Sequence, residues 1–194
     1  MLLLRQHLYP TNYMATPKLF MLLLGCKPKG RHTEQHDIFF GIANELKELV
    51  PAINQFWPEA NGKIHLDAYR LVNHVDGYKV DIIEKSVQNQ SQQKLFFLNL
   101  GGYQSNVFEE IHYKMLLVAS DKASATANAK SSTFFKQYFS PHIDDKYGVD
   151  VDDVFDIEEA LPLEMKEKYT IQFTSAEGLS VDEVVLGYMP IDKL

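Results

Sequence analysis

Hydrophobic residues occur along the chain in short runs separated by polar segments, a spacing typical of β-strands rather than long helices. The runs at 18–25 (KLFMLLLG) and 94–101 (KLFFLNLG) each end in a glycine. Further apolar stretches at 36–43, 63–68, 78–83 and 111–119 predict additional strands, and weaker ones near 141–145 and 154–157 follow. The segments 169–174 and 184–189 predict an extra hairpin around a Glu177-Gly178 turn signal.

Two segments have the composition of helices. An Ala- and Lys-rich stretch begins at Ser120, a residue type that caps helix N-termini. The segment 45–56 is expected to be a second helix with Asn44 as its N-cap and a bend or break at Pro51. A helix that begins at Glu34 is the alternative. The apolar face of the 45–56 helix holds Leu46, Leu49 and Ile53.

An internal repeat organises these elements. Residues 18–43 align with 94–119 at an offset of 76, and nine of the 26 positions are identical. After one inserted residue, 65–80 aligns with 142–157, which pairs His65 with His142 and Asp67 with Asp144. We infer an α/β (α+β) fold built by internal duplication of a β-β-α-β-β unit. The copies are expected to be related by a pseudo-two-fold axis, with helices on one face of mixed or largely antiparallel sheets.

The repeat defines the expected domain organisation. Residues 1–17 form an N-terminal tail, 18–85 the first unit, 86–93 a polar linker, 94–161 the second unit and 162–194 a C-terminal hairpin extension. The N-terminal residues do not have the order of charge and apolar residues of a secretory signal. Whether translation starts at Met1 or Met14 stays open.

Composition indicates a cytoplasmic protein without disulfides. The 194 residues are 45% hydrophobic, enough for a core without metal or disulfide support. The single cysteine, Cys26, fits a reducing compartment. Its counterpart in the second unit is Gly102, so we interpret Cys26 as a small, semi-buried residue and not as a nucleophile. No apolar run is long enough to cross a membrane.

The net charge of −7 argues against nucleic acid as a partner, because polyanion binding normally needs a basic face. The acidic residues are concentrated in the second unit, where 144–159 lacks the spacing of a calcium loop. The one basic cluster, in the loop after the first strand, is a candidate anion-binding site: Lys27, Lys29 and Arg31. This loop has the Gly-x4-Gly spacing of a phosphate loop but lacks the Lys-Ser/Thr that must follow.

The candidate site residues are His and carboxylate pairs two positions apart. On a strand, residues i and i+2 share a face, so each imidazole is expected beside a carboxylate. Three interpretations stay open: hydrogen-bonded positions that pin a sheet edge, a small-ligand or acid–base cleft, and a metal site. The spacing matches no known metal-ligand motif, so we assign no metal and no cofactor. The pairs are Glu34 and His36, His65 and Asp67, Glu110 and His112, and His142 and Asp144.

Four strings taken in order, LLLGCKPKGRHTEQHD, FWPEANGKIHLDA, LFFLNLGGY and HIDDKYGVDVDD, resemble the bacterial family filed as domain of unknown function 1543. The resemblance covers about residues 18–160. It implies a bacterial source and one or two copies of the domain per chain, which suits the repeat. It implies no activity and no catalytic residue.

Two functional hypotheses follow. The first is a non-catalytic binding or accessory protein for an unknown small molecule or protein, with a homodimer as one possible assembly. It rests on the absence of any catalytic motif and on the acidic second unit. The second is a small enzyme that uses the His/Asp pairs, by acid–base or metal-assisted chemistry, on an anionic small substrate. Whether the protein is an enzyme stays open.

Overall fold

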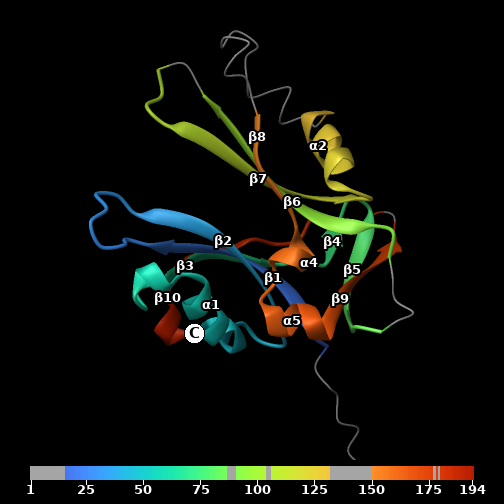
Figure 1. Ribbon diagram of the computed structural model, residues 1–194, viewed down its shortest axis with the longest axis horizontal. Helices are drawn as coiled ribbons and strands as arrows, with labels where there is room; N and C mark the ends of the chain where they lie inside the picture. Colours follow the sequence, from blue (N-terminus) through green and yellow to red (C-terminus); the bar gives the residue numbers. More distant parts are fainter. Residues whose placement is uncertain (1–15, 87–90, 104–105, 132–149, 177, 179) are drawn as a thin grey trace, which may run out of the picture.

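The computed structural model describes residues 16–86, 91–103, 106–131, 150–176, 178 and 180–194. Its elements form three sheets, and every strand pairing in the described part of the chain is antiparallel. Short helices join or cover the strands (Figure 1). The fold is therefore mixed α+β with antiparallel sheets, as the sequence predicted at this level.

The first sheet has the strand order β10-β3-β1-β2. Its strands are β1 (Lys18–Cys26), β2 (Gln35–Ala43), β3 (His65–Leu71) and β10 (Val185–Pro190). The outer face packs against η1 (Leu46–Leu49), α1 (Val50–Phe56) and η2 (Pro58–Ala60). A short 3-10 helix, η3 (Ile191–Lys193), follows β10 and buries Ile191 in the same cluster.

The third sheet, β7-β6-β8, repeats this arrangement with fewer strands. It contains β6 (Lys94–Tyr103), β7 (Glu110–Ala119) and β8 (Asp150–Asp156), and α2 (Lys122–Ser131) packs on its outer face through Ala125 and Ala129. The second sheet, β4-β5-β9, is made of β4 (His74–Val75), β5 (Tyr78–Glu84) and β9 (Tyr169–Ser175). Between β8 and β9 lie α4 (Ile157–Ala160) and α5 (Leu163–Lys168).

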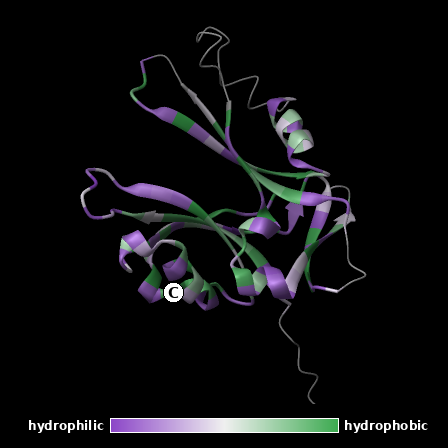
Figure 2. Ribbon diagram, in the orientation of Figure 1, coloured by the Kyte–Doolittle hydropathy of each residue, from purple (hydrophilic) through white to green (hydrophobic). Residues whose placement is uncertain are grey.

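A single apolar cluster joins the three sheets. It includes Leu19 and Phe40 of the first sheet, Leu95 and Phe97 of the third and Ile82 of the second. Figure 2 shows hydrophobic residues along the strands where the sheets approach each other. From this common base the β1–β2 and β6–β7 hairpins diverge, and their loop ends extend in the same general direction (Figure 1). The inner faces of the two hairpins are thus turned toward each other.

The C-terminal segments do not form the expected hairpin. β9 pairs with β5 in the second sheet, whereas β10 pairs with β3 in the first sheet. The prediction was wrong because the hydrophobic pattern identifies a strand but not its partner. Each of these strands finds a distant sheet edge rather than its neighbour in sequence, so 162–194 is not a hairpin extension.

The helix starts also differ from the prediction. Asp121, not Ser120, caps α2, since its Oδ1 accepts a hydrogen bond from the Ser124 amide at 2.8 Å. Asn44 makes no side-chain cap of the following 3-10 helix, and instead its backbone amide donates to Glu48 at 2.9 Å. The expected division of the 45–56 segment is confirmed, with Pro51 in the first turn of α1. The alternative helix from Glu34 is wrong, because β2 occupies that segment.

The first and third sheets have the same strand register around their central strands, β1 and β6, including one irregularity. In the first sheet Gly25 pairs with His36 on one side and His65 on the other, and the register shifts between Leu23 and Leu24. The shift leaves Asp67 as an extra, bulged residue of β3. In the third sheet Gly101 pairs with His112 and Asp150, and the register shifts between Asn99 and Leu100, which leaves Asp152 as the extra residue of β8.

This register corrects the second part of the sequence alignment. The residue of β8 that occupies the place of Asp67 is Asp152, and not Asp144 as the offset of 77 predicted. The offset was wrong because the segment between helix and strand is longer in the second half than a single inserted residue allows. His142 and Asp144 both lie outside the described residues.

Candidate functional site

The first His–carboxylate cluster lies on the inner face of the first sheet and consists of Glu34, His36, His65 and Asp67. His36 shares this face of β2 with Ile38 and Phe40, because alternate residues of a strand point the same way. His65 lies across β1 from His36, at the other side of Gly25. The bulge turns Asp67 toward them, and Glu34 comes from the residue just before β2.

The polar atoms of this cluster are within a few ångströms of one another. His36 Nε2 is 3.2 Å from Asp67 Oδ2 and 3.9 Å from Glu34 Oε2. His65 Nε2 is 2.9 Å from Glu34 Oε1 and 3.4 Å from Asp67 Oδ1. The sequence predicted His65 beside Asp67 and Glu34 beside His36, and the structure brings all four side chains together.

Two buried atoms of this cluster have no hydrogen-bond partner. They are His65 Nε2 and Asp67 Oδ2, and His65 as a whole is only 7% exposed. The neighbouring polar atoms are close, but they lie in directions that make no hydrogen bond. A buried polar atom left without a partner costs free energy, and a bound cation would satisfy both atoms at once.

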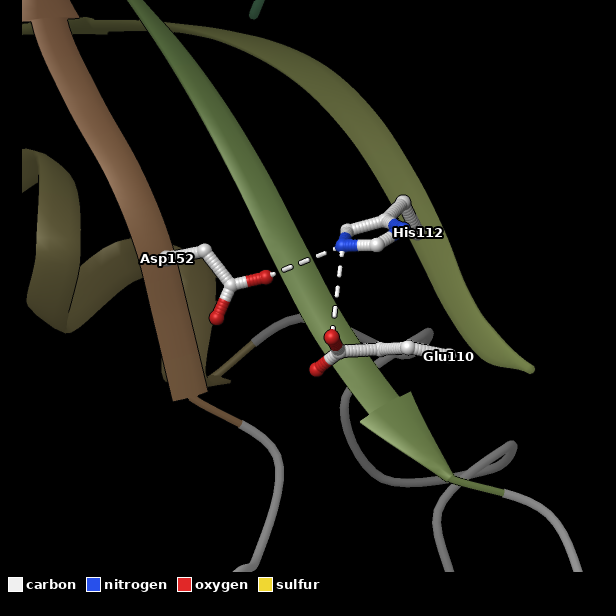
Figure 3. A group of neighbouring side chains, drawn as sticks. All are labelled: Glu110, His112 and Asp152. Atoms are coloured by element: carbon white, nitrogen blue, oxygen red, sulfur yellow. Dashed lines mark ion pairs between the residues drawn. The ribbon is translucent and has the colours of Figure 1, made fainter. Parts of the chain in front are cut away.

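The second cluster, Glu110, His112 and Asp152, occupies the corresponding place in the third sheet. His112 Nε2 is 3.4 Å from Asp152 Oδ2 and 3.7 Å from Glu110 Oε2. Figure 3 shows both carboxylates turned toward this ring nitrogen from separate strands, Asp152 from β8 and Glu110 from the start of β7. One ligand atom from each residue can be chosen so that all three lie within 4.8 Å of one another.

A glycine makes room for each cluster. A Cβ added at Gly25 would collide with His65 Nε2 and would lie 2.7 Å from Asp67 Oδ2. A Cβ added at Gly101 would collide with Asp152 Oδ2 and would lie 2.7 Å from Glu110 Oε1. Any other residue at these positions would therefore fill the space in which the polar groups meet.

The spacing of the donor atoms suits a metal ion, as a set of three in the second cluster and pair by pair in the first. Two ligands that are each about 2.1 Å from a tetrahedral metal ion lie about 3.4 Å apart. The separations from the His36, His65 and His112 Nε2 atoms to their carboxylates range from 2.9 to 3.9 Å. Each cluster also places two carboxylates together, and a cation would relieve their mutual repulsion.

The remaining candidates are distributed differently. Lys29 and Arg31 line a surface pocket of about 730 Å³ together with His36, so the basic loop borders the first cluster, whereas Lys27 is exposed and does not line this pocket. Cys26 points to the opposite face of β1 into the core and is 1% exposed. Burial raises the pKa of its thiol, and the charges of Glu34 and Glu59 raise it further. This agrees with the prediction that Cys26 is no nucleophile.

Sequence reasoning missed one residue of the clusters, Asp152, and the two glycines that make room for them. Asp152 was placed in a general acidic surface stretch, and Gly25 and Gly101 were interpreted as strand ends. The glycines were visible as identical positions when residues 18–43 are aligned with 94–119. Asp152 could not be found by spacing, because a longer connection between helix and strand changes its offset from Asp67.

The fold and these clusters define a class: an α+β protein of antiparallel sheets with a His–carboxylate cluster on the inner face of each of two sheets. Residues 31–82 match the model of a family described as Domain of Unknown Function (DUF1543). The match supports the resemblance for one copy and includes all four residues of the first cluster. No curated protein matches the chain.

A solved structure has a similar fold. It is described as a protein Il1583 from Idiomarina loihiensis, with a TM-score of 0.62 and 24% sequence identity. The similarity covers 90% of this chain and 98% of that chain. At this level of identity the likeness concerns the fold alone. In the described part of the present chain, no helix is long and apolar enough to span a membrane.

Proposed function

We propose that this protein is a ligand-binding protein and that each His–carboxylate cluster binds one divalent metal ion. The observation that carries the proposal is the second cluster, in which an imidazole nitrogen and two carboxylates meet within 4.8 Å. The first cluster supports it independently through its two buried atoms without hydrogen-bond partners. Both sets supply the nitrogen and oxygen donors that first-row transition metals accept.

The two sites should differ in affinity. The first cluster offers two imidazoles and two carboxylates, which favours Zn²⁺, Mn²⁺ or Fe²⁺ over the all-oxygen preference of Ca²⁺ and Mg²⁺. The second offers one imidazole and two carboxylates among the described residues. We expect the first cluster to bind a transition metal more tightly than the second.

Zinc titration of the metal-free full chain by calorimetry tests the proposal. The wild-type protein is expected to bind two ions, and His112→Ala and His36→Ala are each expected to abolish or strongly weaken one of the two binding events. Both side chains are more than one-third exposed, so neither substitution removes core packing. His32→Ala, at an exposed loop position outside both clusters, is the matched control and should retain two ions. Unchanged stoichiometry in both cluster variants would contradict the proposal.

We also propose that the two sites arose by internal duplication of a β-β-α-β-β unit. Support comes from the shared register, the bulged aspartate and the glycine in each sheet. In this view β5 and β9, which pair with each other, are the last strands of the two units.

A substitution tests this equivalence. Asp150 holds the register position in β8 that His65 holds in β3. Asp150→His should therefore raise the zinc affinity of the second site toward that of the first. If the affinity stays the same or falls, the two positions are not equivalent.

Catalysis is a second candidate function, and it is favoured by the surroundings of His65. Its ring packs on Tyr188 with 4.4 Å between ring centroids, and its Nε2 lies beside Glu34 at 2.9 Å. A metal ion held by three protein ligands, or one held by four that accepts a fifth or sixth ligand, keeps a position at which water can bind and become a nucleophile. Hydrolysis of p-nitrophenyl phosphate by the zinc-loaded protein, lost in His65→Ala, would support this function. No turnover with zinc or manganese would count against hydrolysis of anionic esters.

A further inference from the structure

The inner faces of the first and third sheets also border a groove that is separate from the two His–carboxylate clusters. Beyond the first cluster, toward the common base, the inner face of the first sheet becomes apolar. Leu23, Ile38 and Ala68 form the register row two β1 residues from that of Gly25, His36 and His65, on the same face. With Met21 and Val184 they line a hollow of about 200 Å³.

Two cations, one from each sheet, border this hollow. Arg70 lies on β3 in the register row of Met21, and Lys114 lies on β7, two positions from His112 on the same face. Both residues line the apolar hollow, and both line a second hollow of about 730 Å³ that continues toward the β4–β5 turn. The hollows are therefore contiguous at these two cations.

Arg70 is half-buried without a close counterion. Among the described residues no carboxylate lies within 4.0 Å of its guanidinium. The nearby Asp182 accepts hydrogen bonds from the backbone amides of Asn73 and His74 at 2.8 and 3.0 Å. Desolvation lowers the pKa of Arg70, against the influence of Asp182 and Tyr113. A desolvated cation whose neighbouring carboxylate already accepts two backbone hydrogen bonds is stabilised when an external anion binds it.

We propose that this groove binds a small amphipathic carboxylate or phosphate, with its anionic group between Arg70 and Lys114 and its apolar body on Met21, Leu23, Ile38, Ala68 and Val184. A few well-placed charges beside an apolar wall are the usual composition of a small-molecule site. Val184 is 51% exposed, so an apolar body would remove hydrophobic surface from water there.

The groove and the metal clusters are adjacent but separate. The register row of Arg70 is four β1 residues from that of Gly25, roughly 13 Å along the strand. A ligand with a second polar end could reach from Arg70 toward His36. Binding of the anionic end itself does not require a metal ion, so the groove and the metal sites can fail independently.

Calorimetry and chemical-shift titration of the metal-free full chain with hexanoate test the proposal. Acetate supplies the charge without the body, and hexan-1-ol supplies the body without the charge. Hexyl phosphate distinguishes phosphate from carboxylate as the preferred head group. Hexanoate or hexyl phosphate is expected to bind at least tenfold more tightly than acetate and hexan-1-ol, with one molecule per chain.

Arg70→Gln and Lys114→Gln should each weaken that binding at least fivefold, while Lys122→Gln, an exposed lysine on α2, should leave it unchanged. Lys114 is also exposed, so its variant tests the site even if Arg70→Gln unfolds the protein. His36→Ala should still bind hexanoate, which separates this proposal from the metal sites. The proposal would be overturned if neither hexanoate nor hexyl phosphate binds, or if hexan-1-ol binds as tightly as they do. Unchanged affinity of Lys114→Gln for hexanoate and hexyl phosphate would overturn it as well.

Discussion

At the scale of single residues, the two glycines decide whether the clusters can form. Neither Gly25 nor Gly101 has a positive φ, so their backbone conformation admits other residues. The requirement comes from space, since a methyl group would occupy the point where His65 and Asp67, or Glu110 and Asp152, approach the strand. A residue with no side chain is thus part of each site.

Gly25→Ala should lower zinc affinity at the first site at least tenfold and leave the second site unchanged, because the new methyl group pushes His65 and Asp67 apart. Gly101→Ala should have the opposite pattern. Calorimetric titration of both variants measures this, and the untouched site of each variant is its internal control. An alanine at Gly25 that leaves both binding events intact would show that the ions bind elsewhere.

Asp76 provides a residue-scale test of pH dependence. It has a φ of 51° beside Gly77, and its Oδ2 accepts a hydrogen bond from the Val118 amide at 2.8 Å. Desolvation raises the pKa of this carboxyl, and the Val118 hydrogen bond partly opposes that effect. The native state therefore binds this proton more tightly than the unfolded state, and the ionised carboxylate weakens the fold at neutral pH.

Asp76→Asn should be as stable as wild type or more stable at pH 7, because asparagine keeps the acceptor and tolerates a positive φ. The difference should shrink as pH falls through the raised pKa of Asp76, since protonation then removes the charge from the wild type as well. Asp76→Ala should lose about 1–2 kcal/mol through the missing hydrogen bond and the strained backbone. Urea unfolding at pH 7 and pH 4 measures all three proteins. A stability difference between the Asp76→Asn variant and wild type that grows at low pH would contradict a raised pKa for Asp76.

At the scale of elements, the sequence pattern located most described strands to within a few residues. Short-range features explain this success: alternation of apolar residues, terminal glycines and the Pro51 break. Strand partners were harder to predict from the sequence, because β9 and β10 pair with strands β5 and β3, which lie far away in sequence. The bulges at Asp67 and Asp152 shift the register by one residue, and no local pattern announces such a shift.

The cap of α2 tests an element directly. Asp121 accepts the Ser124 amide, and the Ser120 hydroxyl donates to Asp121 Oδ2 at 3.0 Å. Asp121→Ala should lower Tm by about 2–4 °C, because it leaves an amide of the first turn without a partner. Ser120→Ala should change Tm much less, since Ser120 only supports the cap. Equal decreases in Tm for the two variants would contradict Asp121 as the main cap of α2.

At the scale of the whole molecule, the candidate site depends on how two hairpins share one base. The apolar cluster that joins the sheets fixes the inner ends of both hairpins, and the Asp76–Val118 hydrogen bond links the second sheet to the third. Both His–carboxylate clusters then lie on inner faces beyond this base. The sequence identified the His–carboxylate pairs, but their convergence depends on the pairing of β1 with β3 and of β6 with β8.

The most direct test of metal binding is anomalous X-ray diffraction from crystals of the full chain grown with cobalt or zinc. Two peaks are expected in each molecule. One should lie about 2 Å from Nε2 of His36 and His65, and the other about 2 Å from Nε2 of His112 beside the carboxylates of Glu110 and Asp152. Peaks only at lattice contacts, or none at either cluster under a saturating metal concentration, would contradict the account.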